Sequence, residues 1–328
     1  MSEETLSYQD AVRLGEEAWE AIGEEEFERA KEIGQQLIAG DYESGYRVLG
    51  SVHEQMGETE EAEAVLKKGI ETYPENWELF LHLGTLYSEA NRLEEAIKVL
   101  EDAAKLENVE SYWIDMNKAV VYYKMQDVDA ALNTLQKVTH PDMFNEAFAL
   151  QLSILDEVGR YDLLLEVVEE GLEETIPPEN DQDAEVMSRI CFYAAKACYK
   201  EEDEEATQFY LKQAIQYHRS NESTLELIRD IRAEYSDSAT LYGIMVQALY
   251  EPETEEGKES FPFMTTYAVL AENEEEAMNY IRDFEIDDVK RESMQVMEVE
   301  IAEVEEGEES ETEAKGIYMV GGMGFMDE

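Results

Sequence analysis

Residues 43–76, ESGYRVLGSVHEQMGETEEAEAVLKKGIETYPEN, are echoed by the 34 residues that follow them, WELFLHLGTLYSEANRLEEAIKVLEDAAKLENVE. Large and small apolar residues return at the same positions of both segments. The matching positions are Leu49 and Leu83, Gly50 and Gly84, Ala62 and Ala96, and Leu66 and Leu100. Recurrence of this kind at one fixed period indicates a stacked helical repeat, in which neighbouring units bury a continuous core.

Each unit is expected to fold as two antiparallel helices, with small residues where the helices cross closely. Tyr46 and Phe80 open the two segments, Pro74 ends the first, and Gly57 or Asn91 stands at the expected turn between helices. Both residue types tolerate a left-handed backbone. This pattern resembles the tetratricopeptide repeat (TPR) family, and the resemblance implies an α-solenoid that binds other proteins.

Weaker copies begin near Tyr112, Asn145 and Ala184, and a degenerate first copy spans Ala11 to Gly40, with Gly23 inside it. The sequence therefore predicts six helix pairs between about residues 6 and 218. A further helix from Glu222 to Glu234 is expected to cap the solenoid, because terminal repeats need a polar outer face. We assign residues 1–238 to this helical domain.

The repeat pattern stops after Ser238, and residues 239–328 are predicted to form a small α+β domain of unknown role. Its expected order is strand, strand, helix, strand, strand, with the helix over Glu274–Phe284. The first strand, at 241–250, has a helical continuation of the solenoid as its alternative. An acidic loop is expected at 305–313, followed by a glycine-rich strand over Gly316–Met326.

The chain is strongly acidic, with 80 Asp and Glu against 25 Lys and Arg and a net charge of -55. Nucleic acid and anionic membranes are therefore not expected as partners, since both are bound through cationic side chains. Three explanations of the acidity stay open: a solvated surface that keeps the solenoid soluble, adaptation to a saline cytoplasm, and attraction of a basic partner.

The sequence predicts a protein of the reducing cytoplasm. The N-terminus is acidic where a secretory signal would be basic, and no apolar run is long enough to span a membrane. Cys191 and Cys198 lie on one expected helix with Cα atoms about 10.5 Å apart, too far for a disulfide. Both are expected to be buried thiols.

No pattern in the chain predicts catalysis. The four histidines lie in four different repeats, and no nucleophile, zinc or phosphate-loop motif is present. The glycines at 321–324 lack the lysine and the following helix of a phosphate loop. We predict a non-enzyme with no cofactor and no metal site.

In the TPR family the first helix of each pair lines a concave groove, and the resemblance assigns groove positions here. The assigned residues include Glu54 and Glu89, and the candidate site is formed by Arg47, Gln55, Leu81, Thr85, Trp113, Met116, Tyr123, Lys124 and Tyr199. The lysine–asparagine–arginine clamp by which one TPR subfamily holds chaperone tails is absent. Trp113 and Tyr123 have the alternative of packing only between neighbouring helices.

Two functions follow. The first is a scaffold whose groove binds a protein or peptide segment that carries apolar anchors and basic residues. The second is an acidic decoy, inhibitor or immunity-like protein that neutralises a basic partner through its surface charge.

Overall fold

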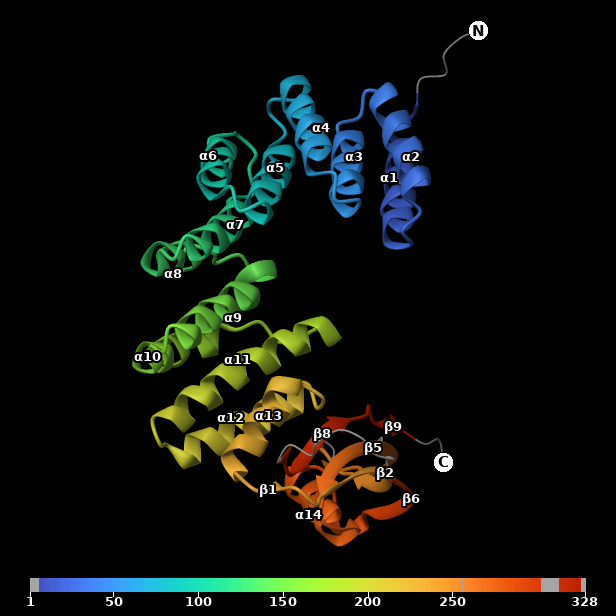
Figure 1. The fold of residues 1–328 in the computed structure, drawn as a ribbon, viewed down its shortest axis with the longest axis vertical. Coiled ribbons are helices and arrows are strands. Elements are labelled where there is room, and N and C mark those ends of the chain that lie inside the picture. The colour runs from blue at the N-terminus through green and yellow to red at the C-terminus, as the bar shows by residue number, and fades with distance from the viewer. Residues whose placement is uncertain (1–5, 255–256, 302–312, 326–328) are drawn as a thin grey trace. The chain divides into compact units, whose positions relative to one another are not determined.

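A computed structural model describes residues 6–254, 257–301 and 313–325 (Figure 1). The chain divides into two compact units, Met1–Ala147 and Phe148–Glu328.

The first unit consists of helix pairs that follow one another along the chain (Figure 1). Its helices are α1 (Tyr8–Gly23), α2 (Phe27–Ala39), α3 (Ser44–Gln55), α4 (Thr59–Thr72), α5 (Trp77–Glu89), α6 (Leu93–Ala103), α7 (Ser111–Lys124) and α8 (Val128–Leu135). The first helix of each pair (A) contacts the second (B), and the A helices α1, α3, α5 and α7 contact one another in order. This arrangement confirms the predicted solenoid.

Small residues at the echoed positions allow the helices of a pair to pack closely. Gly50 packs against Leu66 and Gly84 against Leu100, so that an added Cβ would lie 2.9 and 2.8 Å from the respective leucine Cδ2 atoms. Leu66 and Leu100 are themselves fully buried. The 34-residue repeat in the sequence therefore reflects the same glycine–leucine packing contact in successive helix pairs.

Every helix pair turns through one residue with a positive φ. These residues are Glu25, Gly57, Asn91, Gln126, Gly159 and Glu202, with φ between 58° and 74°. Gly57 and Asn91 were the expected turn residues and are confirmed. In the first pair the left-handed residue is Glu25, two positions after Gly23, because α1 continues through Gly23 before the chain turns.

The second unit begins within α9 (Pro141–Glu157) and continues with α10 (Tyr161–Gly171), α11 (Asp181–Lys200), α12 (Glu204–Tyr217) and α13 (Glu222–Arg232). With α9–α12 the predicted count of six helix pairs is confirmed. Cys191 and Cys198 on α11 are buried free thiols, as expected. Burial raises the pKa of Cys191 to about 12.

An antiparallel sheet follows, in the strand order β6-β2-β5-β8, with β9 also paired to β5. Its strands are β2 (Thr240–Tyr250), β5 (Phe261–Ala271), β6 (Gln295–Ile301), β8 (Gly316–Val320) and β9 (Gly324–Phe325). Helix α14 (Glu274–Phe284) packs on β5 and β8. Two short pairs complete the described strands: β1 (Tyr235–Ser236) with β7 (Glu313–Ala314), and β3 (Glu253–Thr254) with β4 (Gly257–Lys258).

The predicted order of strand, strand, helix, strand, strand is confirmed, including the strand at 241–250. The glycine-rich C-terminal strand was predicted as one element, and this is wrong, since the chain leaves the sheet between β8 and β9. At Gly321 an added Cβ would lie 2.5 Å from Thr266 Oγ1. Residues 305–312 of the predicted acidic loop lie outside the described residues, and Glu313 belongs to β7.

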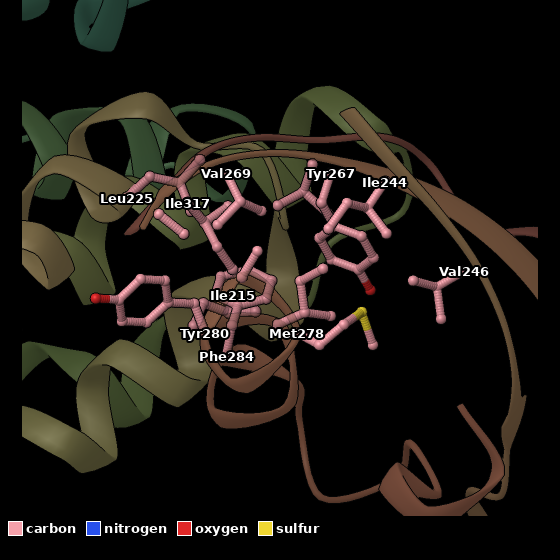
Figure 2. Packing of buried hydrophobic residues seen from close by; sticks show 14 residues of the cluster. Ile215, Leu225, Ile244, Val246, Tyr267, Val269, Met278, Tyr280, Phe284 and Ile317 are labelled. Atoms are coloured by element: carbon pink, nitrogen blue, oxygen red, sulfur yellow. The ribbon is translucent and has the colours of Figure 1, made fainter. Parts of the chain in front are cut away.

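The sheet and the last helices share one core. Ile215 of α12 and Leu225 of α13 pack with sheet residues such as Ile244 and Tyr267, and Figure 2 shows these side chains around Met278 and Phe284 of α14. Helix α13 also packs Leu227 on Leu211 and Ala195 of the preceding pair. The expected capping helix therefore joins helical and sheet layers, and the domain boundary at 238/239 stays a prediction.

A buried ion pair reinforces this junction. Arg219, after α12, donates from Nη1 and Nη2 to the two carboxylate oxygens of Glu285 at 2.9 and 2.6 Å. Tyr267 of β5 also donates to Glu285, whose side chain is 0% exposed. Burial, together with the charge of Glu285, raises the pKa of Tyr267, so the phenol stays a donor.

Candidate partner-binding face

The A helices α3, α5 and α7 of the first unit carry a row of polar contacts from helix to helix. Arg47 Nη1 on α3 lies 2.6 Å from Glu78 Oε2 on α5. Thr85 Oγ1 on α5 donates to Asn117 Oδ1 on α7 at 3.2 Å. We call the surface that carries these contacts the A-helix face.

Lys124 extends this row at the end of α7. Its Nζ donates to the backbone oxygen and the hydroxyl of Ser88 on α5, at 3.2 and 3.1 Å. Side chains from three helices thus hold one another in place, and a ligand would meet a surface that is already ordered. Such preorganisation lowers the entropic cost of binding.

An acidic centre lies on the same face. His82 Nε2 of α5 lies 3.1 Å from Glu54 Oε2 of α3. The other carboxylate oxygen of Glu54, Oε1, is buried and has no hydrogen-bond partner among the described residues. Partial desolvation and the nearby charge of Glu54 raise the pKa of Glu89, although Glu89 as a residue is exposed. The two carboxylates are thus closer together than their charges favour, and an added cation would relieve them.

Aromatic and apolar side chains lie along α7 of the same unit. Trp113, on the first turn of α7, is 38% exposed and is not part of the buried clusters of the described residues. Its neighbour Tyr112 stacks on His140, with ring centroids 4.2 Å apart. Met116 and Tyr123 are half-buried. An exposed tryptophan beside partly buried apolar groups is typical of an anchor site for a partner.

The structure places the predicted site residues on two units. Eight of them lie on α3, α5 and α7: Arg47, Gln55, Leu81, Thr85, Trp113, Met116, Tyr123 and Lys124. Leu81 packs against the core of these helices, and Gln55 is exposed. Tyr199 lies on α11 of the second unit, where it is 37% exposed and has Lys200 Nζ 5.7 Å from its ring centroid.

Two contributors to the face were not assigned from the sequence. They are His82 on α5 and Asn117 on α7. Each is one position away from an assigned residue, Leu81 and Met116 respectively, and each reaches the neighbouring A helix. Residues next to the assigned positions can belong to the same face, because the surface stripe of a helix is broader than one residue per turn. Including them would have found both His82 and Asn117.

The family model of the tetratricopeptide repeat matches residues 54–113, which run from the end of α3 to the start of α7. This segment agrees with the resemblance to the tetratricopeptide repeat family, and the predicted fold class of the chain is confirmed. Tetratricopeptide repeats are an interaction fold, so a protein or peptide is the expected kind of partner. No curated protein matches the chain.

Several solved structures are similar to this chain. PilW, described as a widely conserved type IV pilus biogenesis factor, is 15% identical, with 68% of this chain and 100% of that chain covered at a TM-score of 0.50. The pilF protein of Pseudomonas aeruginosa is 14% identical, with 67% and 97% covered and a TM-score of 0.46. YrrB, described as a TPR protein with an unusual peptide-binding site, is 19% identical, with 56% and 91% covered and a TM-score of 0.41. The likeness to PilW shows the fold alone.

Within the part of the chain that the structure describes, no helix is both long and apolar enough to cross a membrane.

Proposed function

We propose that this protein is a non-enzymatic scaffold that binds a segment of another protein on the A-helix face of α3, α5 and α7. The segment carries an apolar anchor and at least one Lys or Arg. The anchor packs beside Trp113, and the basic side chain reaches Glu54 and Glu89. Binding of an extended or helical segment by a preformed helical surface is a recurring mode of peptide recognition.

One observation carries this proposal. The Glu54 carboxylate has a buried oxygen that no Lys, Arg or His of the described residues reaches, and it lies beside Glu89, whose pKa is raised by burial and by this carboxylate. A buried acceptor without a partner costs free energy, about 1–3 kcal/mol for a typical group. A guanidinium or ammonium group from a partner would satisfy that oxygen and relieve the repulsion between Glu54 and Glu89.

The compartment of action is proposed to be the cytoplasm. The two cysteines are buried thiols that form no disulfide with each other, and reduced cysteines fit a reducing compartment. Fractionation of cells that express the native protein tests this point, and recovery in a membrane or secreted fraction would oppose it.

The net charge of -55 favours a second candidate function. An acidic decoy would hold a basic partner through many dispersed charges, and its affinity would fall steeply with ionic strength. The scaffold depends on a few desolvated contacts, and its affinity would fall much less.

The experiment that separates the two functions uses photo-crosslinking. A photoreactive amino acid at Gln55, which is exposed at the end of α3, would capture the partner in cells, and mass spectrometry would map the crosslinked segment. The scaffold predicts one segment with basic and apolar residues, and its loss in Trp113→Ala. Crosslinks scattered over many basic proteins, unchanged in Trp113→Ala, would support the decoy instead.

A further inference from the structure

A second candidate site lies entirely in the second unit. A cavity of about 190 Å³ opens between α12, α13, α14 and the start of β8. Its walls are mainly apolar side chains: Leu211, Ile215, Ile228, Ile231, Phe284 and Ile317. In Figure 2 Ile215, Tyr280 and Phe284 lie together at this side of the core. A concave apolar space with a few polar groups at its edge is the usual form of a small-molecule site.

The size of the cavity limits the ligand. A dry cavity of about 150 Å³ in another protein holds one benzene molecule. The present cavity is somewhat larger and is open on one side, so it accommodates a single ring or a short alkyl chain. A long lipid or a nucleotide does not fit this volume.

The rim of the cavity is basic, which is unusual for this chain. Lys212, Arg229, Arg232 and Lys315 line it, although the whole protein has only 25 Lys and Arg against 80 acids. Three of the four have an acidic partner. The pairs are Lys212 with Asp287 at 3.1 Å, Arg232 with Asp283 at 3.4 Å and Lys315 with Glu276 at 2.7 Å.

Arg229 differs from the other three. Its Nη1 donates to the backbone oxygen of Ile317 at 2.6 Å, and its guanidinium lies 3.9 Å from the centroid of the Tyr318 ring. No carboxylate among residues 6–254, 257–301 and 313–325 forms an ion pair with it. The guanidinium is therefore held in position at the cavity while its charge has no acidic partner.

Two acids also line the cavity, and neither cancels the charge of Arg229. Glu285 is fully buried and accepts hydrogen bonds from Arg219 and Tyr267, so its charge is already compensated. Asp283 is exposed and faces Arg232. A single unpaired guanidinium beside an apolar cavity matches a ligand with one negative charge and an apolar body, because guanidinium and carboxylate form two parallel hydrogen bonds.

We propose that this cavity binds a small amphipathic carboxylate, whose alkyl chain or ring lies among Ile215, Ile231 and Phe284 and whose carboxylate pairs with Arg229. The site is separate from the A-helix face, and it gives the C-terminal part of the chain a ligand-binding role. Ligand binding here would tie α12, α13, α14 and β8 together, since each contributes to the walls.

Calorimetric titration of the full chain with octanoate tests the proposal, with octanol as the uncharged ligand of the same length. We expect octanoate to bind at least tenfold more tightly than octanol, because charge-assisted hydrogen bonds are worth roughly a factor of ten or more. Arg229→Gln should remove this preference and leave octanol binding unchanged. Arg282→Gln is the matched control, since Arg282 lies on α14, is exposed and does not line the cavity.

A second measurement keeps the test decisive if Arg229→Gln does not fold. In the wild-type protein, octanoate should shift the NMR signals of the Ile228 and Ile231 methyl groups at lower concentrations than it shifts the signals of other methyl groups. The proposal is overturned if octanoate does not bind, if octanol binds equally well, or if Arg282→Gln weakens octanoate as much as Arg229→Gln does. Methyl shifts confined to another part of the chain would overturn it as well.

Discussion

Replacing Arg219 with Met should destabilise the second unit strongly. Glu285 would lose its counter-charge at a position with 0% side-chain exposure, and two hydrogen bonds of 2.9 and 2.6 Å would be lost. Removing one partner of a buried ion pair costs about 3–5 kcal/mol, because the remaining charge stays desolvated. Tyr267 would still donate to Glu285 and would offset part of this cost. We expect Arg219→Met to lower the free energy of unfolding by about 3 kcal/mol.

Urea unfolding measured by two probes tests this value. All three tryptophans, Trp19, Trp77 and Trp113, lie in the first unit. Tryptophan fluorescence therefore reports on the first unit, while circular dichroism reports on helices of both. The unfolding of the second unit is therefore the transition that circular dichroism detects and fluorescence does not. We expect Arg219→Met to move this transition to a lower urea concentration.

The double variant Arg219→Met/Glu285→Leu provides the control, since it removes both charges together. It should recover much of the lost stability, because apolar residues of similar volume often replace a buried ion pair without cost. A loss below about 1 kcal/mol for Arg219→Met, the size of an exposed ion pair, would refute the reasoning. So would a double variant that is less stable than Arg219→Met.

Three further outcomes are expected. Gly57→Ala should lower the free energy of unfolding by about 1 kcal/mol, and Gln126→Gly should raise it by a similar amount, because both residues have a positive φ. A more stable Gly57→Ala or a less stable Gln126→Gly in urea unfolding would contradict this. Leu100→Ala should cost about 2–5 kcal/mol by leaving a cavity against Gly84, measured in the same way, and a cost below that range would argue against close packing. The raised pKa of Glu89 predicts stability that is present in acid and lost as the pH rises through that pKa; thermal unfolding of Glu89→Gln should therefore depend less on pH than that of the wild type.

The repeat architecture was predictable because the same packing contact recurs at a fixed interval. Gly50 and Gly84 each face a leucine of the paired helix, and the sequence shows both partners. The turns between helices were harder to predict from the sequence. Glu25, Gln126 and Glu202 adopt the left-handed conformation without the glycine that normally marks it, since the helices on either side impose the turn geometry.

The join between helices and sheet could not be predicted from local patterns. Leu225 fits the apolar stripe of any surface helix, and nothing near it in the sequence shows that it packs with Ile244 and Tyr267. The same holds for the pair of Arg219 and Glu285, which are 66 residues apart. Long-range contacts of this kind depend on the tertiary fold and leave no periodic signal.

The face on α3, α5 and α7 was predictable in outline and not in its chemistry. The family resemblance assigned Trp113, and the structure shows it exposed. The acidic centre depends on distances between neighbouring helices, such as 3.1 Å from His82 to Glu54. In a chain with 80 acids the sequence alone could not distinguish this carboxylate pair from the others.

The central claim is that a basic, apolar segment binds at Glu54 and Glu89. The most direct measurement is selection from a peptide library by the wild type, by Glu54→Gln/Glu89→Gln and by Glu61→Gln/Glu94→Gln. The last variant makes the same change of charge at exposed positions of α4 and α6. We predict that the wild type and the α4/α6 variant select peptides with basic and apolar residues, and that Glu54→Gln/Glu89→Gln loses them. Identical selection by all three proteins, or an equal loss in both variants, would contradict the claim.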